Sequence, residues 1–98
     1  MSGAIVRIAG KIVNSTTSVS TTATAIPATA ATGRIFEMVK NNGTSTVYLG
    51  DANVTSLNGM PLEPGDVLSF DLKQEVVLYG ITTSGTSDVR ALEGVWWC

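Results

Sequence analysis

The feature that most constrains this chain is the regular alternation of short apolar runs with turn-forming residues. Segments rich in Gly, Asn, Pro, Ser and Asp separate apolar runs at 34–40, 46–50, 67–73, 76–83 and 89–97. Short strands at this spacing, with turn signals between them, are typical of β-sandwiches and β-barrels. No segment places apolar residues at helical spacing over three turns. We therefore expect an all-β chain.

The pattern within each run predicts which faces of the strands are buried. "VLSFDLK" alternates apolar and polar residues, which predicts a strand with one buried and one solvated face. "VVLYGITT" is apolar without interruption and predicts a strand buried on both faces. In "RIFEMVK", Phe36 and Met38 share one face while Ile35 and Val39 share the other. This strand therefore has both faces buried in the domain, or one face buried by a neighbouring subunit.

Two dipeptides predict specific turns. Asn42-Gly43 supplies the positive φ angles of a tight hairpin, so we expect "RIFEMVK" and "TVYLG" to form the first hairpin. Pro64-Gly65 predicts a turn in which proline presets φ and Gly65 adopts a left-handed conformation.

The N-terminal third differs in composition from the rest. Ser and Thr fill 22 positions of the chain, and many of them lie in the tract 14–33. β-Branched and small polar residues favour extended structure, and Pro27 confines that tract to an edge strand. At 98 residues the chain is one domain. We expect a single compact, jelly-roll-like β-sandwich of about 7–9 short antiparallel strands over 23–98, with 1–22 as an N-terminal arm or edge-strand segment.

Charge and hydropathy exclude several classes of partner. Only 14% of residues are charged and the net charge is −2, with the six basic residues scattered singly. No basic stripe is present to neutralise a row of phosphates, so we expect no nucleic-acid partner. No apolar window is long enough to span a membrane, and we expect no signal peptide. A low charged fraction has two interpretations: a surface that is covered in use, or an ordinary Thr-rich sandwich surface.

The residues that carry most enzyme chemistry are missing. The chain has no His, and its one thiol, Cys98, is the last residue. The carboxylates lie singly at turns and strand edges, so we predict a protein that is not an enzyme and uses no cofactor. Asp51, Asn53 and Thr55 have calcium-loop spacing, but the later positions of such a loop lack its Gly and Glu. We favour an Asx-turn in which Asp51 and Asn53 cap backbone amides over a metal site.

The adjacent tryptophans near the C-terminus point to opposite faces of a strand. If Trp97 enters the core with Val89 and Val95, Trp96 faces outward beside Arg90 and Leu92. An exposed Trp96 has three interpretations: an anchor of a subunit contact, a stacking surface for a sugar, or part of a tail folded onto its own sheet.

The run 23–93 resembles a recurrent module of small virion proteins of tailed bacteriophages. The resemblance rests on the ordered segments "AIPAT", "NNGTSTVYLG", "VTSLNGMPLEPGD" and "LYGITTSGTSDVRALE". It implies a structural protein of the virion, either a capsid decoration (cement) protein or a component of a head or tail fibre. It carries no catalytic residues, and it leaves out 1–22 and 94–98.

These arguments combine into one expectation with one alternative. We expect a decoration protein on the capsid surface of the virion, made in the host cytoplasm, which binds the major capsid protein and itself, as a homotrimer. The residues expected to contact partners are Ile5, Val6, Ile8, Ile12, Phe36, Met38, Trp96 and Trp97. The alternative is a fibre-associated module that binds host-surface glycans through Trp96, Tyr48 or Tyr79.

Overall fold

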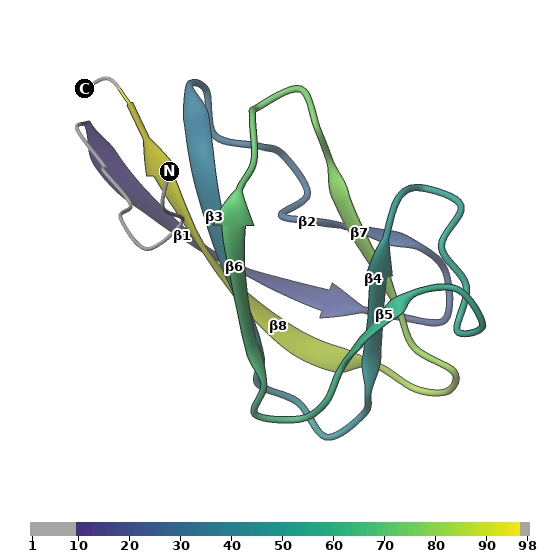
Figure 1. Cartoon of the computed structure of the whole chain (residues 1–98). Helices are drawn as coiled ribbons and strands as arrows, with labels where there is room; N and C mark the ends of the chain where they lie inside the picture. The colour runs from purple at the N-terminus through teal and green to yellow at the C-terminus, as the bar shows by residue number, and fades with distance from the viewer. Residues whose placement is uncertain (1–9, 97–98) are drawn as a thin grey trace.

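The computed structural model describes residues 10–96 and places them in two four-stranded antiparallel sheets (Figure 1). The first sheet has the order β1-β8-β3-β6 and the second β2-β7-β4-β5. The strands are β1 (Lys11–Val19), β2 (Thr24–Ile26), β3 (Arg34–Asn41), β4 (Val47–Gly50), β5 (Met60–Leu62), β6 (Val67–Asp71), β7 (Leu78–Ile81) and β8 (Ser87–Val95).

This strand order is that of a jelly roll. Among the described strands, only β4 and β5 are consecutive in the chain and paired with each other, and every other connection passes from one sheet to the other. The expected all-β, jelly-roll-like sandwich is confirmed, and its eight described strands fall within the expected 7–9.

The core between the sheets consists mainly of β-branched residues. Val19, Val39, Val47 and Val89 are fully buried, one from each of four strands. In β8 the alternation places Val89 and Val95 inside, whereas Trp96 just beyond it is 60% exposed. The predicted directions of these three side chains are confirmed, and Trp97 lies outside the described residues.

The predicted hairpin between β3 and β4 is wrong, because the two strands belong to different sheets. Gly43 does not adopt a positive φ. It is required for space instead, because a Cβ there would lie 2.1 Å from Ser87 Oγ and 2.7 Å from Asp88 N. Asn41 closes this corner by donating from Nδ2 to Ser45 O and to Leu62 O, at 2.8 Å each. The Asn-Gly pair therefore marks a crossing between the sheets.

The strand predicted over 76–83 is shorter than expected and starts later. Only Leu78–Ile81 form β7, and Val76 and Val77 are 52% and 40% exposed. The cause is a turn just before them, in which Val76 N donates to Lys73 O at 3.1 Å. An apolar run therefore overstated both the length and the burial of this strand.

Two turn predictions are confirmed. Gly65 has a φ of 89°, and Asp66 N donates to Glu63 O at 2.9 Å, which closes the Pro-Gly turn. Asp51 Oδ1 accepts a hydrogen bond from Asn53 N at 2.9 Å, which is the expected Asx-turn.

The N-terminal tract forms sheet edges. Lys11–Val19 pair with β8 along their whole length, and β2 ends directly before Pro27 at one edge of the second sheet. The edge-strand assignment for the Thr-rich tract is confirmed. The apolar run 4–8 lies outside the described residues.

Candidate interaction surface

The outer face of the β1-β8-β3-β6 sheet brings together residues from distant parts of the chain. We call this the A face. The register places Ile12 beside Gly94 and Gly94 beside Phe36, and in the next row Leu92 lies beside Met38. Three of the residues expected to contact partners, from two strands, thus share one face. The remaining predicted residues of the N-terminal segment, Ile5, Val6 and Ile8, lie outside the described residues.

The A face exposes apolar side chains. Ile12 is 55% exposed and Met38 36%, and Val67, which the register also places on this face, is 54% exposed. Phe36 is only 6% exposed and therefore adds little to the exposed surface of the A face. Apolar residues that gather on one face in this way are typical of surfaces that meet other proteins.

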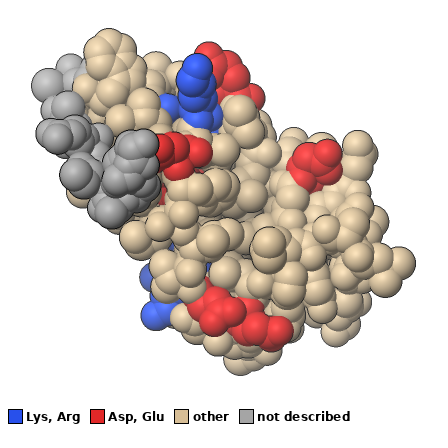
Figure 2. Space-filling view, viewed as in Figure 1, with Lys and Arg blue, Asp and Glu red and all other residues tan. Residues whose placement is uncertain are grey.

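A shallow hollow of about 240 Å³ lies in the middle of the A face. Met38 and Leu92 contribute apolar surface to it, and Lys40 and Arg90 add positive charge at one end. Arg90 Nε donates to Asp88 Oδ2 at 3.0 Å, an exposed pair that contributes little to stability. Only 14% of the residues of the chain are charged. Figure 2 shows this on one side of the molecule, where wide uncharged areas separate the charged groups.

The sheet edges differ in how well they are protected. β2 and β5 are three residues each, and proline follows one and occurs within the other at Pro61. β6 is five residues long and ends at Asp71. β1 has nine residues, contains no proline, shows no bulge against β8, and carries no charge after Lys11. Short strands, prolines, charges and bulges are the devices that prevent strand addition, so among residues 10–96 we call β1 the unprotected edge.

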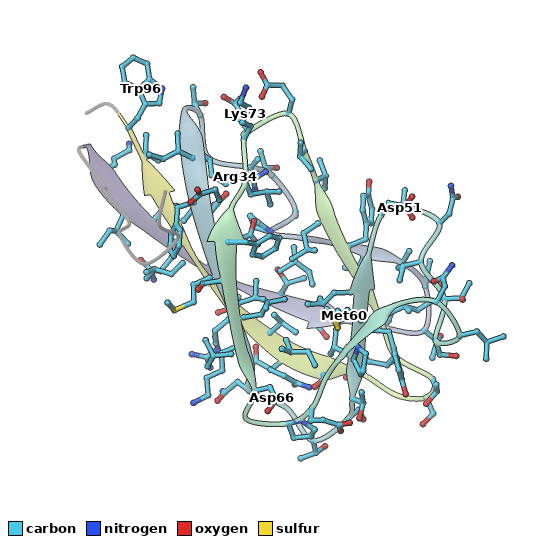
Figure 3. The ribbon with its side chains drawn as sticks, in the orientation of Figure 1. Arg34, Asp51, Met60, Asp66, Lys73 and Trp96 are labelled. Carbon is cyan, nitrogen blue, oxygen red and sulfur yellow. The ribbon has the colours of Figure 1, made fainter. Side chains whose placement is uncertain are left out.

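Trp96 lies apart from Tyr48 and Tyr79, the other two aromatic residues predicted to bind glycans in the alternative function. It projects from the end of β8 near Lys73 (Figure 3), beside a shallow hollow of about 280 Å³ that Gln74 also lines. Tyr48 and Tyr79 are half-buried on the outer face of the second sheet. The three aromatic residues therefore do not share one face.

A second exposed apolar group lies at the start of β5, where Leu57 in the preceding loop is 97% exposed and Met60, the first residue of the strand, is 64% exposed. The sequence analysis did not select these residues, because an isolated apolar residue inside a turn-rich segment gives no periodic signal. Figure 3 shows Met60 on the β5 side of the molecule, away from Trp96.

The sequence analysis also missed a buried charge cluster between β3 and β8. Arg34 NH1 lies 3.0 Å from Glu37 Oε1 and 3.0 Å from Glu93 Oε2, and all three side chains are buried. Glu37 Oε2 has no hydrogen-bond partner among the described residues. Burial raises the pKa of the Glu37 carboxyl to about 7; Arg34 opposes this rise and Glu93 adds to it.

The same guanidinium also holds the connection between β6 and β7. Arg34 Nε donates to Leu72 O at 3.2 Å, and NH2 donates to carbonyl groups of Lys73, Gln74 and Val76. One cation thus contacts one oxygen of each carboxylate and donates to four backbone carbonyl groups of this connection. These contacts give Arg34 a structural role, because they link β3, β8 and the connection between β6 and β7.

Among residues 10–96, no group of three or more His, Cys, Asp or Glu side chains is placed to hold a metal ion. Within the same range, no helix is long and apolar enough to cross a membrane.

No protein-family model matches the sequence, and no curated protein matches it either.

Proposed function

We propose that this chain is a non-enzymatic structural protein of a bacteriophage virion, a capsid decoration protein that binds the assembled head and stabilises contacts between capsomers. The observation that supports this most directly is the A face, where Ile12, Met38 and Val67 are exposed on one sheet surface, and Ile12 lies on the unprotected edge strand β1. Exposed apolar side chains and a free strand edge are what a protein needs to bind another protein by buried area and strand addition.

The fold is compatible with this role without requiring it. Jelly rolls occur in viral capsid proteins and in lectins, and fold alone does not determine function. The low charge of the chain favours close packing of many copies, because few ionised groups need to be desolvated at each contact. Small contributions from each copy sum over a whole head.

The partner in this proposal is the major capsid protein, and the location is the outer surface of the head. The A face offers that partner an apolar centre with Lys40 and Arg90 at one end. A complementary capsid surface would carry apolar residues flanked by carboxylates.

The test uses heads that lack the protein, to which purified protein is added back. We expect wild-type protein to co-sediment with the heads and to raise their resistance to heat and chelators. The double variant Ile12→Lys/Met38→Lys, which places two charges on the A face, should fold but lose binding. Leu57→Lys, a charge on the β5-side loop, is the matched control and should bind normally. The proposal is wrong if heads withstand heat and chelators equally well with and without the protein.

A second candidate is a fibre-associated module that binds host glycans, and it is favoured by one observation. Trp96 is 60% exposed beside a hollow lined by Lys73 and Gln74, and an aromatic ring next to polar groups suits a sugar. Electron microscopy of the virion separates the two candidates, since a regular lattice on the head supports decoration and a few copies at the tail support glycan binding. In the second case, Trp96→Ala should abolish binding on a glycan array.

A further inference from the structure

The unprotected edge of β1 is also self-complementary. Antiparallel pairing of two copies of Lys11–Val19 with full overlap places Lys11 opposite Val19 of the second copy, Asn14 opposite Thr16, and Ser15 opposite Ser15. Each strand has one charge, and the two lysines fall at opposite ends of such a pairing. No like charges therefore meet, and the pairing keeps the A face of one copy continuous with that of the other, because the side-chain alternation stays in phase.

The centre of this pairing contains an unexplained polar atom. Ser15 Oγ is buried and has no hydrogen-bond partner among the described residues, although the Ser15 residue as a whole is half-buried. A buried hydroxyl without a partner costs free energy. Residues directly opposite in antiparallel strands have Cβ atoms about 5 Å apart, so two Ser15 hydroxyls at the centre can hydrogen-bond to each other.

We propose that two copies of this chain associate by antiparallel pairing of β1 with β1 about a two-fold axis at Ser15, which joins two four-stranded sheets into one of eight strands. Such a contact is isologous and closes after two copies. It replaces the homotrimer expected from sequence with a dimer, and it leaves the A face open to a further partner. The inference does not depend on the virion role, since it concerns the isolated chain.

The first test uses charge at the pair formed by Asn14 and Thr16 of the two copies. In Asn14→Glu/Thr16→Glu, like charges lie opposite each other twice in every interface. In Asn14→Lys/Thr16→Glu, opposite charges do. Within the chain, Thr16 lies beside Arg90, so Glu at 16 is tolerated by the fold in both variants.

Sedimentation velocity over a concentration series gives the dimer dissociation constant. We expect a wild-type dimer, a dissociation constant at least about tenfold higher for the Glu/Glu variant, equivalent to 1.4 kcal/mol, and wild-type or tighter association for the Lys/Glu variant. A monomeric wild type at high micromolar concentration overturns the inference. A trimer or an open series of larger species also overturns it, because these would arise from head-to-tail contacts. Equal behaviour of the two double variants excludes the proposed register.

The second test fixes the axis and does not require the charged variants to fold. In a background with Cys98→Ser, Ser15→Cys should form a covalent dimer under mild oxidation or with a short thiol cross-linker. Ser18→Cys is the matched control, because Ser18 is more exposed and therefore more reactive, yet the two copies of residue 18 would lie six residues apart along the pair, about 20 Å. Cross-linking at 18 but not at 15 contradicts the proposed pairing.

Discussion

The buried cluster of Arg34, Glu37 and Glu93 makes the stability of the fold depend on pH. One guanidinium lies 3.0 Å from a carboxylate oxygen of each glutamate, so the cluster has one negative charge in excess when both glutamates are ionised. Glu37 Oε2 has no hydrogen-bond partner among the described residues, and burial raises the pKa of this carboxyl from 4.5 to about 7. Between pH 4.5 and about 7, the Glu37 carboxyl therefore holds a proton in the folded protein that it releases in the unfolded chain.

The sign and size of the effect follow from this difference. A pKa raised on folding contributes stability that is fully present below the unfolded value of 4.5 and is lost as pH rises through the folded value of about 7. The difference of 7 minus 4.5 is 2.5 units, and at 1.36 kcal/mol per unit the loss is about 3 kcal/mol. Domains of this size unfold with about 5–15 kcal/mol, so this loss is a large share of the total.

The assay is urea unfolding followed by tryptophan fluorescence at several pH values between 4.5 and 8. The chain has no His, the side chain whose ordinary pKa lies within this window. The hydrogen bond from Asn42 and the proximity of Arg90 hold the pKa of Asp88 below its usual value, so the stability linked to Asp88 is lost only as pH falls below about 4, outside the window. We expect the free energy of unfolding to fall by about 3 kcal/mol as pH rises across it.

Glu37→Gln identifies the group responsible. Glutamine has the shape of the protonated glutamate and cannot ionise, so the variant should match the wild type near pH 5 and exceed its stability near pH 8. Glu63→Gln, at an exposed turn, is the control and should keep the wild-type slope. A wild type with constant stability over this window, or a Glu37→Gln variant with an unchanged slope, would refute the reasoning.

Two further predictions concern the corner between β3 and β4. Gly43→Ala forces the backbone at Ser87 to move and should cost about 2 kcal/mol in urea unfolding, whereas Gly65→Ala, which has open space but a φ of 89°, should cost about 1 kcal/mol. Asn41→Ala removes the hydrogen bonds that its amide makes across the corner and should cost about 3 kcal/mol. Asn42→Ala, at an exposed neighbour, should cost under 1 kcal/mol, and equal costs for the two asparagines would contradict the assigned role of Asn41.

The interaction surface was only partly predictable. Ile12, Met38 and Trp96 were predicted from the sequence to contact partners, and the structure exposes all three. Their grouping was not predictable, since Ile12 and Met38 meet on one face only because β8 lies between β1 and β3. The exposed Leu57 gave no signal, because a single residue in a turn has no period.

The sequence by itself determined the class of fold and the approximate positions of most strands and of two turns. Period-two alternation and turn residues act over a few neighbouring residues, so "RIFEMVK", "TVYLG" and the Pro64-Gly65 turn can be recognised without knowledge of the rest. Asp51 likewise makes its turn with its own neighbours.

Only the tertiary structure decided which strands pair and which polar groups are buried. An Asn-Gly pair is compatible with a hairpin or with a crossing between sheets, and the choice at Gly43 depends on Ser87, far away in the chain. Arg34 and Glu93 are 59 residues apart in the chain. The sequence around each one is that of an ordinary surface charge, and the two are buried together only because β3 and β8 are neighbours in the sheet. Contacts of this kind depend on the whole topology, because the free energy of burying a charge is set by what surrounds it and leaves no local pattern.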